Sequence, residues 1–245
     1  MFDTLKSRFF QGKQFIKDIK NAQMRNEFRG FPVFKGTEIT EDFSCPTGAL
    51  NTNSYAIDIG KCTFCGACSR ALGCIEFSNG YKLGATSREN LIITPDIKYE
   101  DYIKNAIKIR EEIKKTFGHS LKLRQVSAGG CNGCEMELNA CSNVNFDMGR
   151  FGIDFVASPR HADGIVITGP ITKNMAFALE DCYKSVPNPK ILILCGACAI
   201  SGGIFKDSDE LDRTFLEKYP IDLYIPGCPV PPLTFINAIL DFTQK

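Results

Sequence analysis

The sequence of 245 residues contains no tryptophan, two histidines, and no stretch of about 18 or more consecutive apolar residues. It therefore offers no candidate for a membrane-spanning helix, and no apolar signal segment follows a charged N-terminus. We expect a cytoplasmic protein. The formal net charge of +1 provides no global field that would attract nucleic acid or an acidic partner. Apolar residues make up 44% of the sequence, enough for the core of one large domain or two modest ones.

Cysteine, by contrast, is abundant, with 12 residues. A chain of this size and apolar content does not need disulfide bonds to fold, so metal binding explains the thiols better. Four lie in apolar or helical contexts, where a free cysteine is usually a small buried hydrophobe. These are Cys74, Cys141, Cys182 and Cys195. The other eight lie in turns flanked by glycine or proline and are the candidate ligands: Cys45, Cys62, Cys65, Cys68, Cys131, Cys134, Cys198 and Cys228.

Residues 1–29 place apolar side chains such as Phe2, Leu5 and Phe9 at near-helical spacing, with lysine and arginine between them. The pattern predicts a basic amphipathic segment. One interpretation is a tail that docks on a partner or a membrane surface. The other is a helix packed on its own domain. Both are open here, and docking gives the more specific prediction.

Residues 30–98 are irregular and rich in glycine, with a Cys45-Pro46 turn followed by Cys62-x2-Cys65-x2-Cys68. Three cysteines at this spacing are typical of one half of a bacterial two-cluster ferredoxin. In that family the fourth ligand comes from the Cys-Pro of the other half. The segment resembles such a ferredoxin whose first motif has lost its three leading cysteines.

This resemblance implies a single [4Fe–4S] cluster held by Cys45 and the three later cysteines. Cys74 departs from the ferredoxin pattern, because five residues separate it from Cys68 and no proline follows it. We therefore expect Cys74 to bind no cluster.

Residues 100–117 carry apolar side chains at helical intervals, and a glycine follows as a stop signal, so we expect one connecting helix. Beyond it, apolar runs alternate with helical patterns, which predicts a parallel α/β sheet. The expected strands are 121–126, 153–157, 165–168, 191–195 and 223–225, and the expected helices are 136–141, 173–183 and the segment after 232. Sites in such sheets form at the carboxyl ends of strands, where the turns of Cys131, Cys198 and Cys228 fall.

The second half of the sequence also contains several distinctive motifs. They are Cys131-Asn132-Gly133-Cys134-Glu135, Arg150-Phe151-Gly152-Ile153, Ser158-Pro159-Arg160-His161, Thr168-Gly169-Pro170-Ile171, Gly196-Ala197-Cys198-Ala199 and Pro226-Gly227-Cys228-Pro229. Together they resemble the small subunit of nickel–iron hydrogenases and the related 20 kDa cluster-bearing subunit of respiratory complex I. The likeness is greatest to membrane-associated hydrogenases of the formate hydrogenlyase type.

The resemblance implies that Cys131, Cys134, Cys198 and Cys228 hold a second [4Fe–4S] cluster, next to the active site of a partner. Two residues separate the first pair, which is the hydrogenase arrangement, since complex I has two adjacent cysteines. The spacing also favours Cys198 over Cys195 as a ligand, because Cys195 ends a strand and Cys198 lies in the turn after it.

The expected architecture therefore has four parts. A docking segment (1–29) precedes an α+β ferredoxin-like domain with one cluster (30–98). A connecting helix (99–119) then leads into a flavodoxin-like parallel-sheet domain with the second cluster (120–245).

Four further polar residues flank the second set of cysteines or follow an expected strand. Glu135 and Glu137 are either surface carboxylates of a helix or take part in proton relay or in an interface with the large subunit. Arg160 and His161 are either structural or tune the cluster potential by hydrogen bonding.

The expected function is electron transfer within an oxidoreductase, with two [4Fe–4S] clusters and no catalytic residue in this chain. The cysteine pairs that hold nickel in a hydrogenase large subunit are absent from the sequence, so hydrogen chemistry is expected in such a partner, alongside other electron-transfer and membrane-arm subunits. A quinone-linked or nickel-free module related to complex I is the alternative. A zinc-stabilised binding module fits poorly, because two cluster-like sets in order would be a coincidence.

Overall fold

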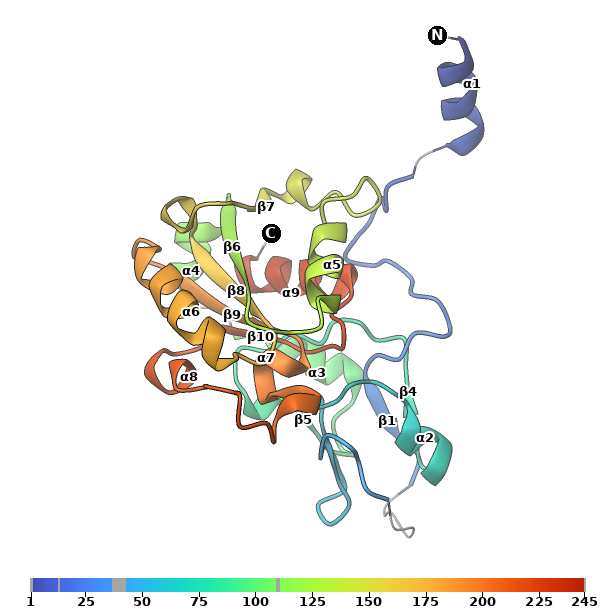
Figure 1. Cartoon of the computed structure of the whole chain (residues 1–245). Coiled ribbons are helices and arrows are strands. Elements are labelled where there is room, and N and C mark those ends of the chain that lie inside the picture. The colour runs from blue at the N-terminus through green and yellow to red at the C-terminus, as the bar shows by residue number, and fades with distance from the viewer. Residues whose placement is uncertain (1, 13, 37–42, 109–110, 245) are drawn as a thin grey trace.

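The computed structural model describes residues 2–12, 14–36, 43–108 and 111–244 (Figure 1). Its centre is a parallel sheet of five strands in the order β10-β9-β8-β6-β7. The strands are β6 (Leu121–Ser127), β7 (Ile153–Phe155), β8 (Gly164–Thr168), β9 (Ile191–Cys195) and β10 (Leu223–Ile225). Counted from the first strand of the sheet, this is the flavodoxin-like order 2-1-3-4-5, read from the β7 edge. The predicted flavodoxin-like sheet and all five of its strands are confirmed.

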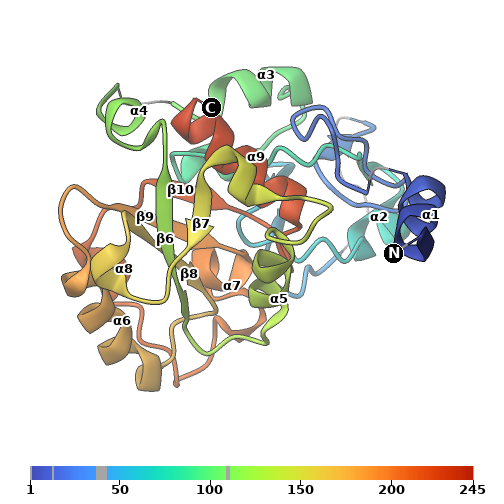
Figure 2. The same ribbon diagram turned by 90° about the horizontal axis from the view of Figure 1, so that it is seen from above.

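Helices cover both faces of this sheet (Figure 2). On one face, α5 (Gly133–Ala140), α4 (Glu111–Phe117) and α9 (Pro232–Thr243) pack with Leu121, Val166 and Ile193. On the other face, α6 (Lys173–Ser185), α7 (Ala197–Ser201) and α8 (Phe215–Lys218) pack with Ile165 and Leu192. Every residue of β8 and β9 is buried, as expected for strands covered on both faces. Short 3-10 turns complete this half: η2 (Met148–Phe151), η3 (Pro159–His161) and η4 (Gly203–Phe205).

The N-terminal half is built from two small antiparallel sheets. In one, β1 (Pro32–Phe34) pairs with β4 (Ile75–Phe77). In the other, β3 (Ala56–Asp58) lies between β2 (Leu50–Asn51) and β5 (Ile92–Ile93). Helix α2 (Ala67–Leu72) follows the close cysteine triplet, and a 3-10 turn η1 (Glu89–Leu91) leads into β5. Short strands and one short helix are consistent with the predicted α+β class.

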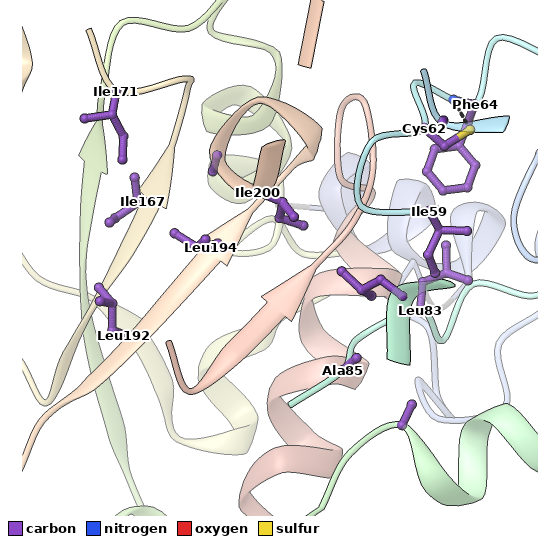
Figure 3. Packing of buried hydrophobic residues seen from close by; sticks show 14 of the residues in the cluster. Ile59, Cys62, Phe64, Leu83, Ala85, Ile167, Ile171, Leu192, Leu194 and Ile200 are labelled. Atoms are coloured by element: carbon purple, nitrogen blue, oxygen red, sulfur yellow. Dashed lines mark hydrogen bonds between the residues drawn. The ribbon is translucent and has the colours of Figure 1, made fainter. Parts of the chain in front are cut away.

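The two halves share one hydrophobic core. Ile59 and Leu83 from the N-terminal half belong to the same buried cluster as Leu194 of β9, and Ile200 of α7 lies between these groups (Figure 3). Ala85 also pairs antiparallel with Tyr224, with N–H···O distances of 2.9 and 2.8 Å. The N-terminal half therefore covers the exposed edge of β10, the strand that leads to Cys228.

The expected single helix over residues 100–117 is wrong. The structure has α3 (Tyr99–Asn105) and α4 instead. Carbonyl groups that would continue α3 accept hydrogen bonds from outside it, since Ala106 O accepts from the Thr86 N–H at 2.9 Å and from the Asn90 side chain at 3.2 Å. Tertiary contacts thus end the helix within an otherwise helical pattern.

The first 29 residues divide into two different parts. Helix α1 (Phe2–Gln11) buries none of its residues and projects from the body (Figure 1). Farther along, Ile19 is 2% exposed within the core under α9, and its carbonyl accepts from the Asn237 amide at 2.9 Å. Of the two interpretations, packing on the chain's own domain holds for this later part, and only α1 is free to dock.

Candidate functional site

The first four candidate cysteines line one cavity. Cys45 lies in a turn closed by the Gly48 N–H, which donates to the Cys45 carbonyl at 2.9 Å. Cys62, Cys65 and Cys68 come from the loop that enters α2, and the cavity enclosed by all four holds about 350 Å³ of empty space. Its other walls include apolar side chains of Leu50, Ile57 and Phe77. The structure therefore brings the predicted ferredoxin-like set together, which we name the first cysteine set.

The thiols of the first cysteine set affect one another's charge. Burial raises the pKa of Cys62 to about 12, and the neighbouring Cys68, Cys45 and Cys65 raise it further. Burial also acts to raise the pKa of Cys45, but hydrogen bonds from the Leu50 N–H and the Thr47 hydroxyl outweigh it, so this pKa lies below its ordinary value. Four thiolates in this cavity need a cationic centre to offset their mutual repulsion.

The second cysteine set comes from three strand ends of the parallel sheet. Cys131 and Cys134 follow β6, Cys198 follows β9, and Cys228 follows β10. The turns of Cys198 and Cys228 are joined by the Ala197 N–H, which donates to the Gly227 carbonyl at 2.9 Å. The thiols interact, because burial and then the charges of Cys228, Cys134 and Cys131 raise the pKa of Cys198 to about 12.

Two glycines leave room for the sulfur atoms of the second set. A Cβ atom on Gly196, whose φ is +95°, would lie 2.6 Å from the Cys134 Sγ. A Cβ on Gly203 would lie 2.9 Å from the Cys198 Sγ. Real Cβ atoms do not approach other atoms so closely, so any side chain at these positions would displace a thiol. The backbone thus forms a cradle shaped around the thiols.

Cys195 has a role that the sequence did not indicate beyond burial. Its thiol is fully buried and donates a hydrogen bond to the Cys134 sulfur, which is the largest effect lowering the pKa of Cys134. The preference for Cys198 over Cys195 as a ligand is consistent with this geometry, because Cys195 lies behind Cys134. Hydrogen bonds to ligand sulfur are among the features that set the potential of iron–sulfur clusters.

The two glutamates of α5 differ in their surroundings. Glu135 is 6% exposed and accepts hydrogen bonds from the Ser127 hydroxyl at 2.6 Å and the Thr168 hydroxyl at 2.7 Å. It therefore anchors α5 to the ends of β6 and β8, and the interpretation as a surface carboxylate is wrong for it. Glu137 is partly exposed, and burial raises its pKa.

Glu137 faces an open cavity of about 740 Å³ between the two cysteine sets. Cys65 of the first set and Cys228 of the second line the same cavity, and the Cys65 charge contributes to a raised pKa of Cys228, after burial and the nearer thiols. Arg29 also lines it and donates from Nε to the Phe64 carbonyl at 2.5 Å. The two sets therefore face each other across one cavity, which we name the inter-site cavity.

The structure does not bring Arg160 and His161 to the second cysteine set. Both are exposed in η3, which lies directly before β8, whereas the cysteine turns follow strand ends. The five residues of β8 span about 3.3 Å each, so most of a strand length separates η3 from the thiols. The predicted hydrogen bonding to the cluster is therefore wrong for these two residues.

The donor chemistry of both sets fits an iron–sulfur cluster. Within the parts of the chain that the structure describes, no three His, Cys, Asp or Glu side chains converge closely enough to hold a single metal ion. The thiols instead surround a hollow, as a multi-iron cluster bound by one cysteine per iron requires. Over the same described residues, no helix combines the length and hydropathy needed to cross a bilayer.

Comparison with known proteins places the second cysteine set in a family. Residues 131–242 match the family described as NADH ubiquinone oxidoreductase, 20 kDa subunit. An uncharacterized protein of Methanocaldococcus jannaschii is 40% identical over 126 residues, which cover 51% of this chain and 84% of that protein. The chain belongs to this family. Membership implies an iron–sulfur cofactor and confirms the predicted resemblance for the C-terminal half.

Other relatives come from hydrogenases and from complex I. The probable membrane-bound hydrogenase subunit mbhJ of Pyrococcus furiosus is 35% identical over 134 residues, or 55% of this chain and 80% of that protein. Formate hydrogenlyase subunit 7 of Escherichia coli is 43% identical over 124 residues, or 51% of this chain and 49% of the relative. An NADH-quinone oxidoreductase subunit of Citrifermentans bemidjiense is 41% identical over 112 residues, or 46% and 65% of the two chains.

Among solved structures, a chain of the archaeal membrane-bound sulfane sulfur reductase is similar at 30% identity and a TM-score of 0.46, over 54% of this chain and 73% of that one. The family match begins at Cys131, so the first cysteine set lies outside it.

Proposed function

We propose that this chain is an iron–sulfur electron-transfer subunit of a multi-subunit nickel–iron hydrogenase. It would relay electrons between a [4Fe–4S] cluster in the first cysteine set and another in the second set, next to a large catalytic subunit. The observation that carries the proposal is the inter-site cavity, which Cys65 and Cys228 line together. An electron moving between the two sets then crosses a single space within one chain.

The chain's own residues would bind the clusters and control their surroundings. A [4Fe–4S] cluster held by four thiolates gains and loses one electron within a range of roughly −700 to +450 mV. Cys45, Cys62, Cys65 and Cys68 would hold one, and Cys131, Cys134, Cys198 and Cys228 the other. Leu50, Ile57 and Phe77 exclude water from the first site, while the Cys195 thiol orients the Cys134 sulfur at the second.

A hydrogenase large subunit is the partner that we propose for the second set. The Cys131-x2-Cys134 spacing is of the hydrogenase type, and relatives are named as subunits of a membrane-bound hydrogenase and of formate hydrogenlyase. Large apolar side chains are exposed beside the thiols, with Met136 at 65% and Ile204 at 66%, as expected for a surface that a partner covers. Glu137, rather than the buried Glu135, is the carboxylate placed for a polar contact there.

A quinone-linked or nickel-free module related to complex I is the second candidate, because relatives are also named as subunits of NADH-quinone oxidoreductases. Nickel in the complex that co-purifies with this chain would distinguish the candidates. Nickel at about one equivalent supports the hydrogenase. Its absence from an intact complex supports the second candidate.

Iron and sulfide analysis tests the cofactor assignment directly. Two sets of four thiols predict about eight iron and eight sulfide per chain after anaerobic purification. A count of about four without zinc would mean that one set is empty. Zinc in place of iron would contradict the proposal altogether.

We also propose that α1 holds the complex at the cytoplasmic face of a membrane, on a membrane-arm subunit or on lipid. Phe2, Phe9 and Phe10 are 76–85% exposed, and lysine and arginine lie among them. Deleting residues 2–11 is expected to move most of the complex from the membrane fraction to the soluble fraction without changing its iron content. Fractionation followed by iron analysis would measure both quantities.

A matched pair of variants tests which part of α1 acts. Phe9→Ser with Phe10→Ser removes exposed apolar area, whereas Lys6→Gln with Arg8→Gln removes charge. The first pair should release the complex strongly, and the second only at low ionic strength, where surface charges act most. Loss of iron or precipitation after the deletion would instead mean that α1 belongs to the core.

A further inference from the structure

Arg213 is held against the turn that carries Cys198. It lies in the segment before α8, and its Nη1 donates to the Pro170 carbonyl at 2.9 Å and to the Cys198 carbonyl at 3.2 Å. Nη2 donates to the carbonyls of Ala199 at 2.8 Å and Ile200 at 3.1 Å. Four carbonyl groups therefore fix the guanidinium at the backbone of a second-set cysteine.

The charge of Arg213 is partly removed from water and has no carboxylate partner. Among the residues that the structure describes, none of the ion pairs includes Arg213. The neighbouring Asp212 instead accepts from the Thr214 hydroxyl at 2.7 Å and from the Thr214 N–H at 3.1 Å. Removing a cation from water is costly unless an opposite charge lies near. The carbonyl dipoles supply part of that compensation.

An anionic group at the second cysteine set would supply the rest. Burial lowers the pKa of Arg213, and the negative charge of the Cys198 sulfur opposes this effect. Four thiolates around a [4Fe–4S] core carry net negative charge, which becomes more negative on reduction. A nearby fixed cation therefore stabilises the reduced state more than the oxidised state.

We propose that Arg213 is the counter-charge of the second cluster and raises its reduction potential. The inference rests on the proposed cofactor, and it makes Arg213 a positioning residue that acts through the field at Cys198. Glu135, buried beside Cys134 with its two hydroxyl partners, carries the opposite charge. The potential of the second cluster would then reflect a balance between one fixed cation and one buried anion.

Substitution of Arg213 in the full-length, anaerobically purified chain tests the proposal. Arg213→Gln keeps donors for the carbonyl groups but removes the charge, and Arg213→Lys keeps the charge. Redox titration followed by electron paramagnetic resonance measures the midpoint potential of each cluster. We expect Arg213→Gln to lower the reduced-to-oxidised ratio of the second cluster at a fixed solution potential roughly tenfold, which is about 59 mV for one electron.

Three comparisons make the outcome specific. The first cluster should keep its potential in every variant, and Arg160→Gln, which removes an exposed and distant charge, should change neither cluster. Arg213→Lys should stay close to the wild-type potential. Equal shifts in the Gln and Lys variants, or no shift in a fully loaded Arg213→Gln protein, would overturn the proposal and leave only a structural tie.

Loss of the second cluster in Arg213→Gln has its own test. A charge role predicts that Arg213→Lys restores cluster content, whereas a purely structural tie predicts that it fails too, because an ammonium cannot reproduce the planar fork of donors. Failure of the proposed function is separate, since it would appear as missing iron in the wild-type protein.

Discussion

Replacement of Cys45 by serine is expected to halve the iron and sulfide of the purified chain, from about eight to about four of each. Cys45 lines the cavity of the first cysteine set with Cys62, Cys65 and Cys68, although 17 positions separate it from the nearest of them in the sequence. A hydroxyl at this position is a much poorer ligand for iron than a thiolate, so the first cluster should be lost while the second remains.

Cys74→Ser is the matched control for this experiment. Cys74 follows the same motif in sequence, but it does not line the cavity and instead lies beside Tyr55, whose pKa is raised mainly by burial and then by Cys74. Its substitution should leave iron, sulfide and visible absorption unchanged. Loss of iron in Cys74→Ser together with full retention in Cys45→Ser would contradict the pairing of Cys45 with the later motif.

Replacement of Cys134 by alanine is expected to abolish hydrogen-coupled dye reduction in the assembled complex. The second set lies at the carboxyl ends of three strands, where a cluster can face a partner, and Cys134 would be one of its ligands. Electrons would then lose the relay nearest to the partner's active metal. The isolated wild-type chain should pass electrons to a dye but neither produce nor consume hydrogen.

Cys141→Ala controls for the loss of a thiol from the same region of α5. The Cys141 thiol is fully buried and contacts the Glu137 carbonyl at 3.4 Å, outside the second set. This variant should keep its hydrogen activity, at some cost in stability from the small cavity created. Pull-down of the large subunit separates loss of electron transfer from loss of docking in Cys134→Ala. An assembled Cys134→Ala complex that lacks the second cluster yet reduces dye at the normal rate would contradict the proposed electron path.

The sequence by itself determined the elements of the C-terminal half. Unbroken apolar runs such as residues 191–195 predict strands buried on both faces, and their regular alternation with helical patterns leaves few topologies other than a parallel sheet. The candidate ligands were equally accessible, because glycine and proline around a cysteine mark turns. These signals are local, and each depends on a few neighbouring residues.

The tertiary structure alone decided which residues act together. The division between α3 and α4 depends on Thr86 and Asn90, which take up carbonyl groups from a distant helix. The burial of Ile19 under α9 likewise has no signature in the pattern around it, since an apolar residue at helical spacing can face either solvent or a core. Such contacts join residues that are far apart in the chain, so periodicity carries no trace of them.

The same reason applies to the site. Spacing predicted two groups of four cysteines, but only the folded chain places Cys65 and Cys228 on one cavity, because the N-terminal half pairs with the edge of β10. The roles of Cys195 and Arg213 also depend on long-range geometry. One contacts a thiol 61 positions earlier, and the other reaches a carbonyl 43 positions earlier. Ligand identity is therefore a local property of this sequence, whereas the electrostatic surroundings of the ligands arise only from its tertiary packing.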